Sequence, residues 1–482
     1  MSYLRSVAGS LIKAGAKHIY YTVPVQYRYG KRFRDIHQFL MDSQWWSTKA
    51  LQEYQMKQLS KVLKHAYENV PYYRAAFSER GLKPEDIQDF NDFRKLPFLS
   101  KDDLRNRLDE LVATNIPKDT MEWETTGGST AQPLGIFSEK RNGISSLAFE
   151  WRQWNWMGFA FDERYALVRG NFVDCPNEKT ASWWKYDRKR RSLILSSFEM
   201  TKDTVGQYLE KIEQFEPAMI RGYPSSLELL AKYSAESNLS INRKGTIRSI
   251  STSSETLLPI QKRLIEAAFQ CPVFDLYGNG ELAGKMGECE RHEGLHDFME
   301  YSYTEIVDFE GKPVNQEGAI GELVVTGFTN YAVPLIRYKI GDLAQFTSRT
   351  CSCGRGLSLI ANVRGRVQEL IVAKDGGLIP LGPAIFGIHD AEWTKVRQLQ
   401  FVQEEKGKVT IRVVKSQLYP DFAAEKYVRR LFSERFKDRV TLEIHFVSEI
   451  PTTNAGKHKF LIQKLPVSLE SLKSATDGLA GN

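Results

Sequence analysis

Helical and β-rich segments alternate between about residue 100 and about residue 345, and this alternation restricts the fold more than any other feature of the chain. The β-rich runs are residues 164–169, 217–220, 247–251, 272–276 and 302–308. Between them, segments such as 203–214 and 224–236 carry apolar residues at helical spacing. Strands that alternate with helices predict an α/β domain built on mixed or largely parallel sheets.

The pattern changes after Gly365. From there the sequence predicts strands at 369–373, 397–403, 408–414 and 440–446 and a helix at 421–436. At 482 residues the chain is too long for one hydrophobic core, since cores stop growing near roughly 250–300 residues. We therefore predict a large N-terminal domain over 1–366 and a small α+β domain over 367–482.

The N-terminal region is basic and helical. Residues 1–34 contain seven Lys or Arg and no acid before Asp35, with apolar residues interspersed. A leader of this kind, taken as 1–45, is compatible with peripheral contact to anionic lipid, and a solvated or packed leader helix is the favoured alternative. Apolar spacing then predicts one long helix over 46–80, and Ser100 is positioned to cap a short helix after it.

Composition excludes several classes of protein. Hydrophobic content of 42% and charged content of 26% are ordinary for a globular chain, and no apolar run approaches the ~18–20 residues of a membrane span. Five unevenly spaced cysteines do not form a disulfide framework, which favours a reducing compartment. A net charge of +7 without a basic and aromatic patch gives no sign of nucleic-acid binding. We expect a cytoplasmic protein, with membrane association through the leader left open.

Four short motifs carry groups suited to nucleotide chemistry. A loop rich in glycine and hydroxyl groups spans 125–133, and its amides and hydroxyls suit a polyphosphate, although it lacks the lysine of a Walker loop. Tyr277 and Glu281 follow a predicted strand, where the ring can stack on a purine and the carboxylate can hold magnesium. Asp342 lies on a glycine turn, and Lys457 follows a glycine in a polar turn. Each motif alone is also compatible with an ordinary surface turn.

Taken in this order, the motifs resemble those of the AMP-forming, adenylate-forming enzymes, a superfamily that includes acyl-coenzyme A ligases and firefly luciferase. The resemblance covers roughly 90–465. It rests on the segments 125–133, 277–281, 321–327, 338–342, 365–366 and 456–457. The segments 334–342, 351–355 and 70–74 resemble the phenylacetate:coenzyme A ligase branch, and 126–130 resembles its CapK group, which is associated with capsule biosynthesis.

The resemblance implies a role for each matching residue. Ser129 and Thr130, with Thr126 and Gly128 in the same loop, are expected at the ATP phosphates. Ser254, Glu255, Tyr277 and Gly278 are expected at the adenine, Glu281 at Mg²⁺, and Asp342 at both ribose hydroxyls. Arg366 is expected beside ribose or phosphate. Lys457 is expected to bridge the carboxylate and the α-phosphate, which lowers the repulsion between two anions.

Cysteine and histidine spacing predicts a structural zinc site. Cys289, Cys351 and Cys353 with one imidazole supply the donors of a closed tetrahedral site. The resemblance favours His296 as the fourth ligand, with His292 as the alternative. Free cysteines beside surface histidines remain the competing interpretation.

The chain also departs from the family pattern. Ala131 replaces a loop glycine, Gly280 replaces a hydroxyl residue, and Glu369 stands where a hinge aspartate is usual, while Lys459 is an alternative to Lys457. The tryptophans at 151, 154 and 156 are expected mainly in the core, and 155–161 and 221–225 are the stretches where we expect the acid to bind.

The resemblance implies a two-domain ligase that uses ATP and Mg²⁺ to convert a carboxylic acid to an acyl-adenylate and then transfers the acyl group to coenzyme A. It also makes a homodimer reasonable. Two alternatives stay open. One is transfer of the acyl group to a carrier protein or a surface polysaccharide. The other is an inactive nucleotide-binding scaffold, which the departures at 131 and 280 motivate.

Overall fold

The N-terminal helices lead into the large domain. The computed structural model describes residues 20–125, 134–169, 183–197, 200, 203–308, 310–366, 370–381, 395–416, 420–453 and 458–465. The first helices are α2 (Val25–Arg28), α3 (Lys31–Ser43), α4 (Thr48–Asn69) and α5 (Pro71–Ser78). Of the leader predicted at 1–45, residues 1–19 lie outside the described residues. Among the residues that are described, no helix is both long enough and apolar enough to cross a bilayer.

The single helix expected over 46–80 is in fact two helices, α4 and α5. The break falls at Val70, whose φ and ψ of −117° and 112° are extended, and Pro71 begins α5. Proline has no backbone N–H and disfavours the helical conformation in the residue before it, so the chain stops and restarts here. The predicted cap is present: the Ser100 hydroxyl accepts the Asp103 N–H at 3.0 Å at the start of α7 (Lys101–Asn106).

Short elements complete the first part of the chain. These are η1 (Pro84–Asp86), α6 (Phe90–Phe93), α8 (Leu108–Leu111), η2 (Lys118–Thr120) and the hairpin of β1 (Met121–Thr125) and β2 (Gly135–Glu139). The predicted phosphate loop connects β1 to β2, and 126–133 lies outside the described residues.

A twelve-stranded sheet forms the centre of the molecule, in the order β11-β12-β13-β14-β10-β9-β8-β7-β6-β3-β5-β4. The strands are β3 (Tyr165–Arg169), β4 (Trp184–Asp187), β5 (Ser192–Ser196), β6 (Met219–Gly222), β7 (Ser249–Ser253), β8 (Val273–Gly278), β9 (Lys285–Glu288), β10 (Leu295–Asp297), β11 (Ser302–Val307), β12 (Ile320–Gly327), β13 (Tyr338–Phe346) and β14 (Leu359–Arg366). Only β5, β3, β6, β7 and β8 pair in parallel. The sheet is therefore more mixed than the alternation predicted, because the chain returns through short turns after β8.

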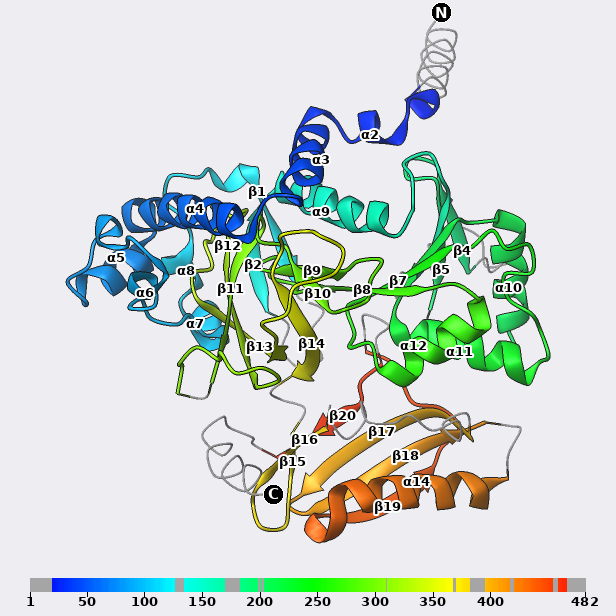
Figure 1. The fold of residues 1–482 in the computed structure, drawn as a ribbon. Coiled ribbons are helices and arrows are strands. Elements are labelled where there is room, and N and C mark those ends of the chain that lie inside the picture. Colours follow the sequence, from blue (N-terminus) through cyan, green and yellow to red (C-terminus); the bar gives the residue numbers. More distant parts are fainter. Residues whose placement is uncertain are drawn as a thin grey trace, which may run out of the picture.

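Four helices flank the parallel strands: α9 (Asn142–Trp156), α10 (Val205–Phe215), α11 (Pro224–Glu236) and α12 (Pro259–Phe269). Figure 1 shows α9 on one face of the sheet and α11 and α12 on the other. The tryptophans at 151, 154 and 156 are 1%, 1% and 7% exposed and pack in the core on the α9 side, as expected.

A second, four-stranded sheet follows in the C-terminal part. It contains β17 (Val396–Glu405), β18 (Lys408–Lys415), β19 (Thr441–Phe446) and β20 (Leu461–Gln463), in the order β19-β18-β17-β20. The hairpin of β15 (Leu370–Val372) and β16 (Leu378–Pro380) precedes it, and α14 (Asp421–Phe436) and η4 (Lys437–Arg439) lie between β18 and β19. In the core of this α+β unit Phe401, Phe432 and Phe436 pack together, and Leu258 and Ile260 at the start of α12 belong to the same cluster. Figure 1 shows it below α11 and α12.

Candidate functional site

The ends of the parallel strands bring several predicted site residues to one edge of the large sheet. Ser254 follows β7, and Tyr277 and Gly278 end β8. Ser254 has a φ of 71°, which is uncommon outside glycine and redirects the chain at the strand end. Ligands of open α/β sheets bind outside the carboxyl ends of the strands, so this edge is where a nucleotide site is expected.

Tyr277 and Asp342 meet directly. The Tyr277 hydroxyl donates to Asp342 Oδ2 at 2.7 Å, although 65 residues separate the two in sequence. Asp342 lies in β13 and is 8% exposed. The backbone of Asp342 also pairs with that of Arg366 on β14, which brings a third predicted residue to the same strands. The arrangement joins an aromatic ring to an oriented carboxylate, and these are the groups that a purine and a ribose require.

Glu281 lies in the turn between β8 and β9. Its carboxylate is almost fully buried and its Oε1 accepts the Tyr338 hydroxyl at 3.0 Å. Burial and the neighbouring Glu281 raise the pKa of Tyr338 far above its ordinary value, so Tyr338 stays a neutral donor. One carboxylate oxygen fixed by a phenol, in a turn at the strand edge, fits a magnesium site that is completed by phosphate oxygens.

Glu255 connects the large sheet to the C-terminal part of the chain. Its Oε2 accepts the Ser225 N–H at 3.0 Å, and its Oε1 accepts the Ser225 hydroxyl at 2.9 Å and the His458 N–H at 2.7 Å. The preceding Ser254 hydroxyl accepts a hydrogen bond from Arg169 Nη2 at 3.3 Å. One carboxylate therefore orients both the start of α11 and the segment that follows Lys457 in the sequence.

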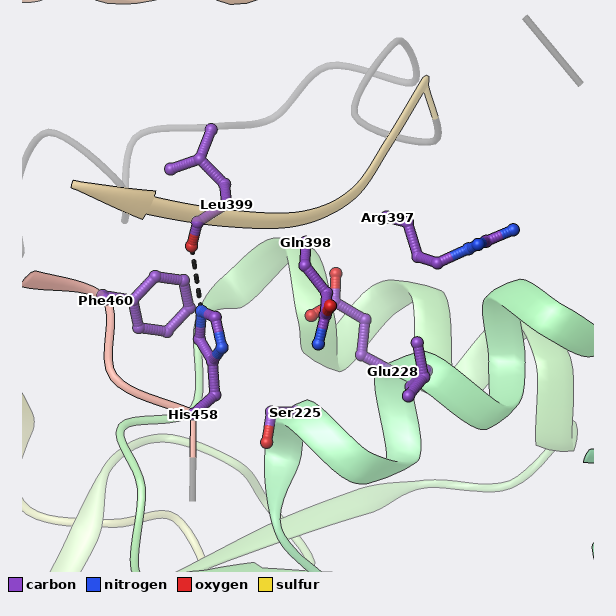
Figure 2. A pocket seen from close by; sticks show the side chains of 8 residues that line it. Ser225, Glu228, Arg397, Gln398, Leu399, His458 and Phe460 are labelled. Carbon is purple, nitrogen blue, oxygen red and sulfur yellow. Dashed lines mark hydrogen bonds between the residues drawn. The ribbon is translucent and has the colours of Figure 1, made fainter. Parts of the chain in front are cut away.

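A small pocket marks the contact between the two parts of the chain. It lies between β17 and α11 and is lined by Ser225, Glu228, Leu229, Arg397, Gln398, Leu399, His458 and Phe460. Figure 2 shows His458 and Phe460 beside Leu399, whose carbonyl lies 2.9 Å from His458 Nε2. Nearby, Lys232 Nζ pairs with Glu228 at 2.8 Å and donates to the carbonyls of Val396 and Arg397 at 2.5 and 3.2 Å. Hydrogen bonds and an ion pair therefore join the two parts of the chain, beside an apolar cluster that Leu258 and Ile260 share with the C-terminal part.

The predicted metal ligands form one cluster. Donor atoms of Cys289, His296, Cys351 and Cys353 all lie within 4.8 Å of one another. Cys289 Sγ is 3.6 Å from Cys351 Sγ, and Cys353 Sγ is 3.5 Å from His296 Nε2. His292, the alternative ligand, instead contacts Lys262 at 3.2 Å and Glu288 at 3.4 Å. Three sulfurs and one imidazole fit a tetrahedral zinc site without an open position.

Sequence and structure comparisons agree with this arrangement. Residues 371–464 match the CapK C-terminal domain. Protein CapK of Staphylococcus aureus is 25% identical over 86% of this chain and 89% of its own length. A phenylacetate-coenzyme A ligase of Pseudomonas putida is 26% identical over 69% of this chain and 74% of its own. Over most of its length the chain is therefore similar to CapK and to phenylacetate-coenzyme A ligases.

The fold agrees with that of a solved member of the superfamily. A crystal structure of 2-hydroxyisobutyryl-CoA ligase in the postadenylation state superimposes with a TM-score of 0.68 at 19% identity. The superposition covers 89% of this chain and 92% of the ligase. This chain therefore shares its overall fold with that ligase.

Several predicted residues lie outside the described part of the chain. They are Thr126, Gly128, Ser129, Thr130 and Lys457, together with the side chain of Arg366 and the departures Ala131 and Glu369. Their roles remain predictions.

The sequence reasoning missed three partners of the site. Tyr338 lies inside a quoted motif but was given no role, although an aromatic residue before a glycine turn is a usable signal. Ser225 was named only as part of a stretch for acid binding. Arg169 carries no local signal, because only the parallel pairing of β3 with β6 brings it to this edge.

Proposed function

We propose that the protein is an AMP-forming acid:thiol ligase. It activates a carboxylic acid with ATP to an acyl-adenylate and releases pyrophosphate, and the acyl group then passes to coenzyme A with release of AMP. The contact between Tyr277 and Asp342 is the observation that carries this proposal. Phenylacetate-coenzyme A ligases among the relatives support the same reaction class.

Each described residue has a chemical task in this reaction. The Tyr277 ring stacks on adenine while its hydroxyl holds Asp342 ready to accept the two ribose hydroxyls. Glu281, oriented by Tyr338, would hold Mg²⁺, which neutralises phosphate charge when it is bound. Thr126, Gly128, Ser129 and Thr130 are assigned to the phosphates by sequence alone, as are Arg366 and Lys457.

The domain assignment of 1–366 and 367–482 also belongs to this proposal. The bond between Glu255 and the His458 N–H joins the two domains beside the nucleotide edge, which suits the adenylation step. Rotation of the C-terminal domain would break that bond and the bonds of Lys232, and would give the thiol access to the acyl-adenylate. Glu369 is the proposed hinge residue.

The test is carboxylate-dependent ATP/pyrophosphate exchange, followed by addition of coenzyme A. We expect exchange that depends on an acid, and thioester formation once the thiol is present. Lys457→Ala should abolish exchange while ATP binding persists, and Lys459→Ala is the matched control. If exchange is unchanged in Lys457→Ala and lost in Lys459→Ala, Lys459 rather than Lys457 is the catalytic lysine. If the protein binds ATP but shows no exchange with any of the acids, the alternative of an inactive nucleotide-binding scaffold is favoured.

A second candidate retains adenylation and changes the acceptor. CapK aligns with 86% of the chain, whereas the phenylacetate-coenzyme A ligase of Pseudomonas putida aligns with 69%. The similarity to CapK is the reason for considering an acceptor other than coenzyme A, such as a carrier-protein thiol or a polysaccharide hydroxyl or amine. Exchange without thioester formation would support this candidate.

We further propose that Cys289, His296, Cys351 and Cys353 hold one structural Zn²⁺. The ion would tie the turn after β9 and strand β10 to the segment before β14. No open position is left for substrate, so it would take no part in the reaction.

A further inference from the structure

A charged cluster lies between α9 and the sheet, and it includes Arg221, the first residue of the 221–225 stretch where the sequence predicted acid binding. Glu150 of α9 accepts from Arg221 Nη1 of β6 at 2.7 Å and from Lys285 Nζ of β9 at 2.9 Å. The side chains of Arg221, Glu150 and Lys285 are only 13%, 17% and 7% exposed. One carboxylate thus faces two cations at a site with little water. A third cation, Arg169, approaches the same edge and has no ion pair with any described residue.

Two buried hydroxyls on the same face have no hydrogen-bond partner among the described residues. Ser251 and Ser253 of β7 are 0% and 5% exposed, and neither Oγ atom bonds to a described residue; the same holds for Nε of Arg221. Arg221 pairs with Ser251 across the parallel strands, and paired residues point to the same face. Buried polar groups are almost always hydrogen-bonded in native proteins. These unpartnered groups therefore indicate that a polar ligand completes their bonding.

The position of this cluster suits a substrate of the site described above. The chain runs from β3 outward to β5 and then crosses back to β6 on the other side of β3, so β3 and β6 flank the point where the strand order reverses. Arg169 ends β3 and Arg221 lies near the end of β6. Such a switch point is where open α/β sheets bind ligands. Lys285 also pairs with Gly278, which follows Tyr277.

We infer that the acid activated by this protein is small, polar and doubly anionic: a hydroxylated acid whose second negative charge meets Arg221 and Lys285 and whose hydroxyls bond to Ser251 and Ser253. This inference rests on the proposed ligase function and specifies its substrate. An aryl or fatty tail would leave both hydroxyls without partners among the described residues, and would leave two cations to share the single carboxylate of Glu150. Sites built to hydrogen-bond a substrate reject analogues that lack the bonding group by up to roughly 10⁴-fold.

The first test compares kcat/KM for ATP/pyrophosphate exchange across matched acids. The set is malate and tartrate, one monomethyl ester of each, phenylacetate and octanoate. We expect kcat/KM for malate or tartrate to exceed that for its ester, and for the two apolar acids, by at least about 100-fold. Faster exchange with phenylacetate or octanoate would overturn the polar-substrate inference and leave the ligase function intact. Absence of exchange with every acid would overturn both.

The second test uses variants that keep the shape of the site. Arg221→Met should lower kcat/KM for the best dianionic acid at least about 10-fold and change that for its ester less than about threefold, because only the dianion loses a charged bond. Arg248→Met, which removes an exposed arginine paired with Glu163, is the matched control. Ser253→Ala removes one hydroxyl without a charge and should lower kcat/KM for the hydroxylated acid only. If kcat/KM falls equally for the dianionic acid and its ester in both Arg221→Met and Ser253→Ala, these two residues have a structural role and the inference is refuted.

Discussion

Replacement of Asp342 by alanine tests the nucleotide site most directly. The side chain is 8% exposed and its Oδ2 is already oriented by the Tyr277 hydroxyl at 2.7 Å, so the carboxylate needs no rearrangement to accept ribose hydroxyls. A hydrogen bond to a charged acceptor is worth about 1.5–3 kcal/mol, so loss of both ribose bonds costs about 3–6 kcal/mol. At about 1.4 kcal/mol for each factor of ten, the dissociation constant for ATP should rise by about 10²- to 10⁴-fold.

Tyr277→Phe separates orientation from direct binding. The variant keeps the ring that is proposed to stack on adenine and removes one bond to the Asp342 carboxylate. We expect a smaller loss of ATP affinity, about 10-fold, because the carboxylate remains but is no longer held in place. In the double variant the two losses should not add, since the hydroxyl of Tyr277 acts only through Asp342.

Calorimetric titration with a non-hydrolysable ATP analogue measures both effects. Urea denaturation of each variant checks that the fold persists, since loss of affinity in an unfolded protein would carry no information. Glu310→Ala, a change at an exposed carboxylate in the loop after β11, is the matched control and should leave the affinity unchanged. Affinity of Asp342→Ala within about threefold of the unaltered protein would remove Asp342 from the nucleotide site and refute the reasoning.

Three further predictions concern other parts of the molecule. Cys351→Ser should reduce bound zinc from about one ion per chain and lower the melting temperature; full stability after metal removal, checked by elemental analysis and calorimetry, would exclude a structural ion. Burial and Glu288 raise the pKa of Asp275 to about 7, above the value near 3.8 of the unfolded chain, so the native state holds the extra proton. Stability should therefore fall as pH rises from about 4 to 7, by about 2–4 kcal/mol from this group; Asp275→Asn should show a flatter urea-unfolding profile, and an identical profile would contradict the assignment. Glu255→Ala should slow ATP/pyrophosphate exchange about 10- to 100-fold, because the His458 N–H loses its acceptor. Thioester formation from synthetic acyl-adenylate should change less than about threefold, and equal slowing of both half-reactions would argue against a role in docking.

Local patterns in the sequence were sufficient for most of the secondary structure. Apolar spacing predicted the helices at 224–236 and 421–436 with the bounds that the structure has. The prediction of one long helix at 46–80 was wrong. Apolar periodicity continues through Pro71, but the missing N–H of that proline interrupts the helical hydrogen bonds. Parallel pairing was overestimated after β8, because strands joined by short turns return antiparallel whatever their composition.

For the candidate site as well, the sequence determined some features and the tertiary structure decided others. Chemical type is a local property, so the sequence alone determined which residues can serve: an aromatic ring at 277, carboxylates at 281 and 342, and three thiols with a nearby imidazole. Which of them meet was decided only by the tertiary structure. Strand pairing brings Tyr277 to Asp342 across 65 residues, and one turn brings His296 rather than His292 to the cysteines.

The charged cluster is the clearest case. Glu150, Arg221 and Lys285 belong to a helix and two strands. The sequence predicted acid binding at 221–225 but gave no sign that Glu150 and Lys285 meet Arg221. Their burial between α9 and the sheet removes the water that would otherwise screen them, and only the strand order places them at the switch point. The sequence determines the chemistry of each residue. Proximity and desolvation turn that chemistry into a site, and they arise only when distant segments pack together.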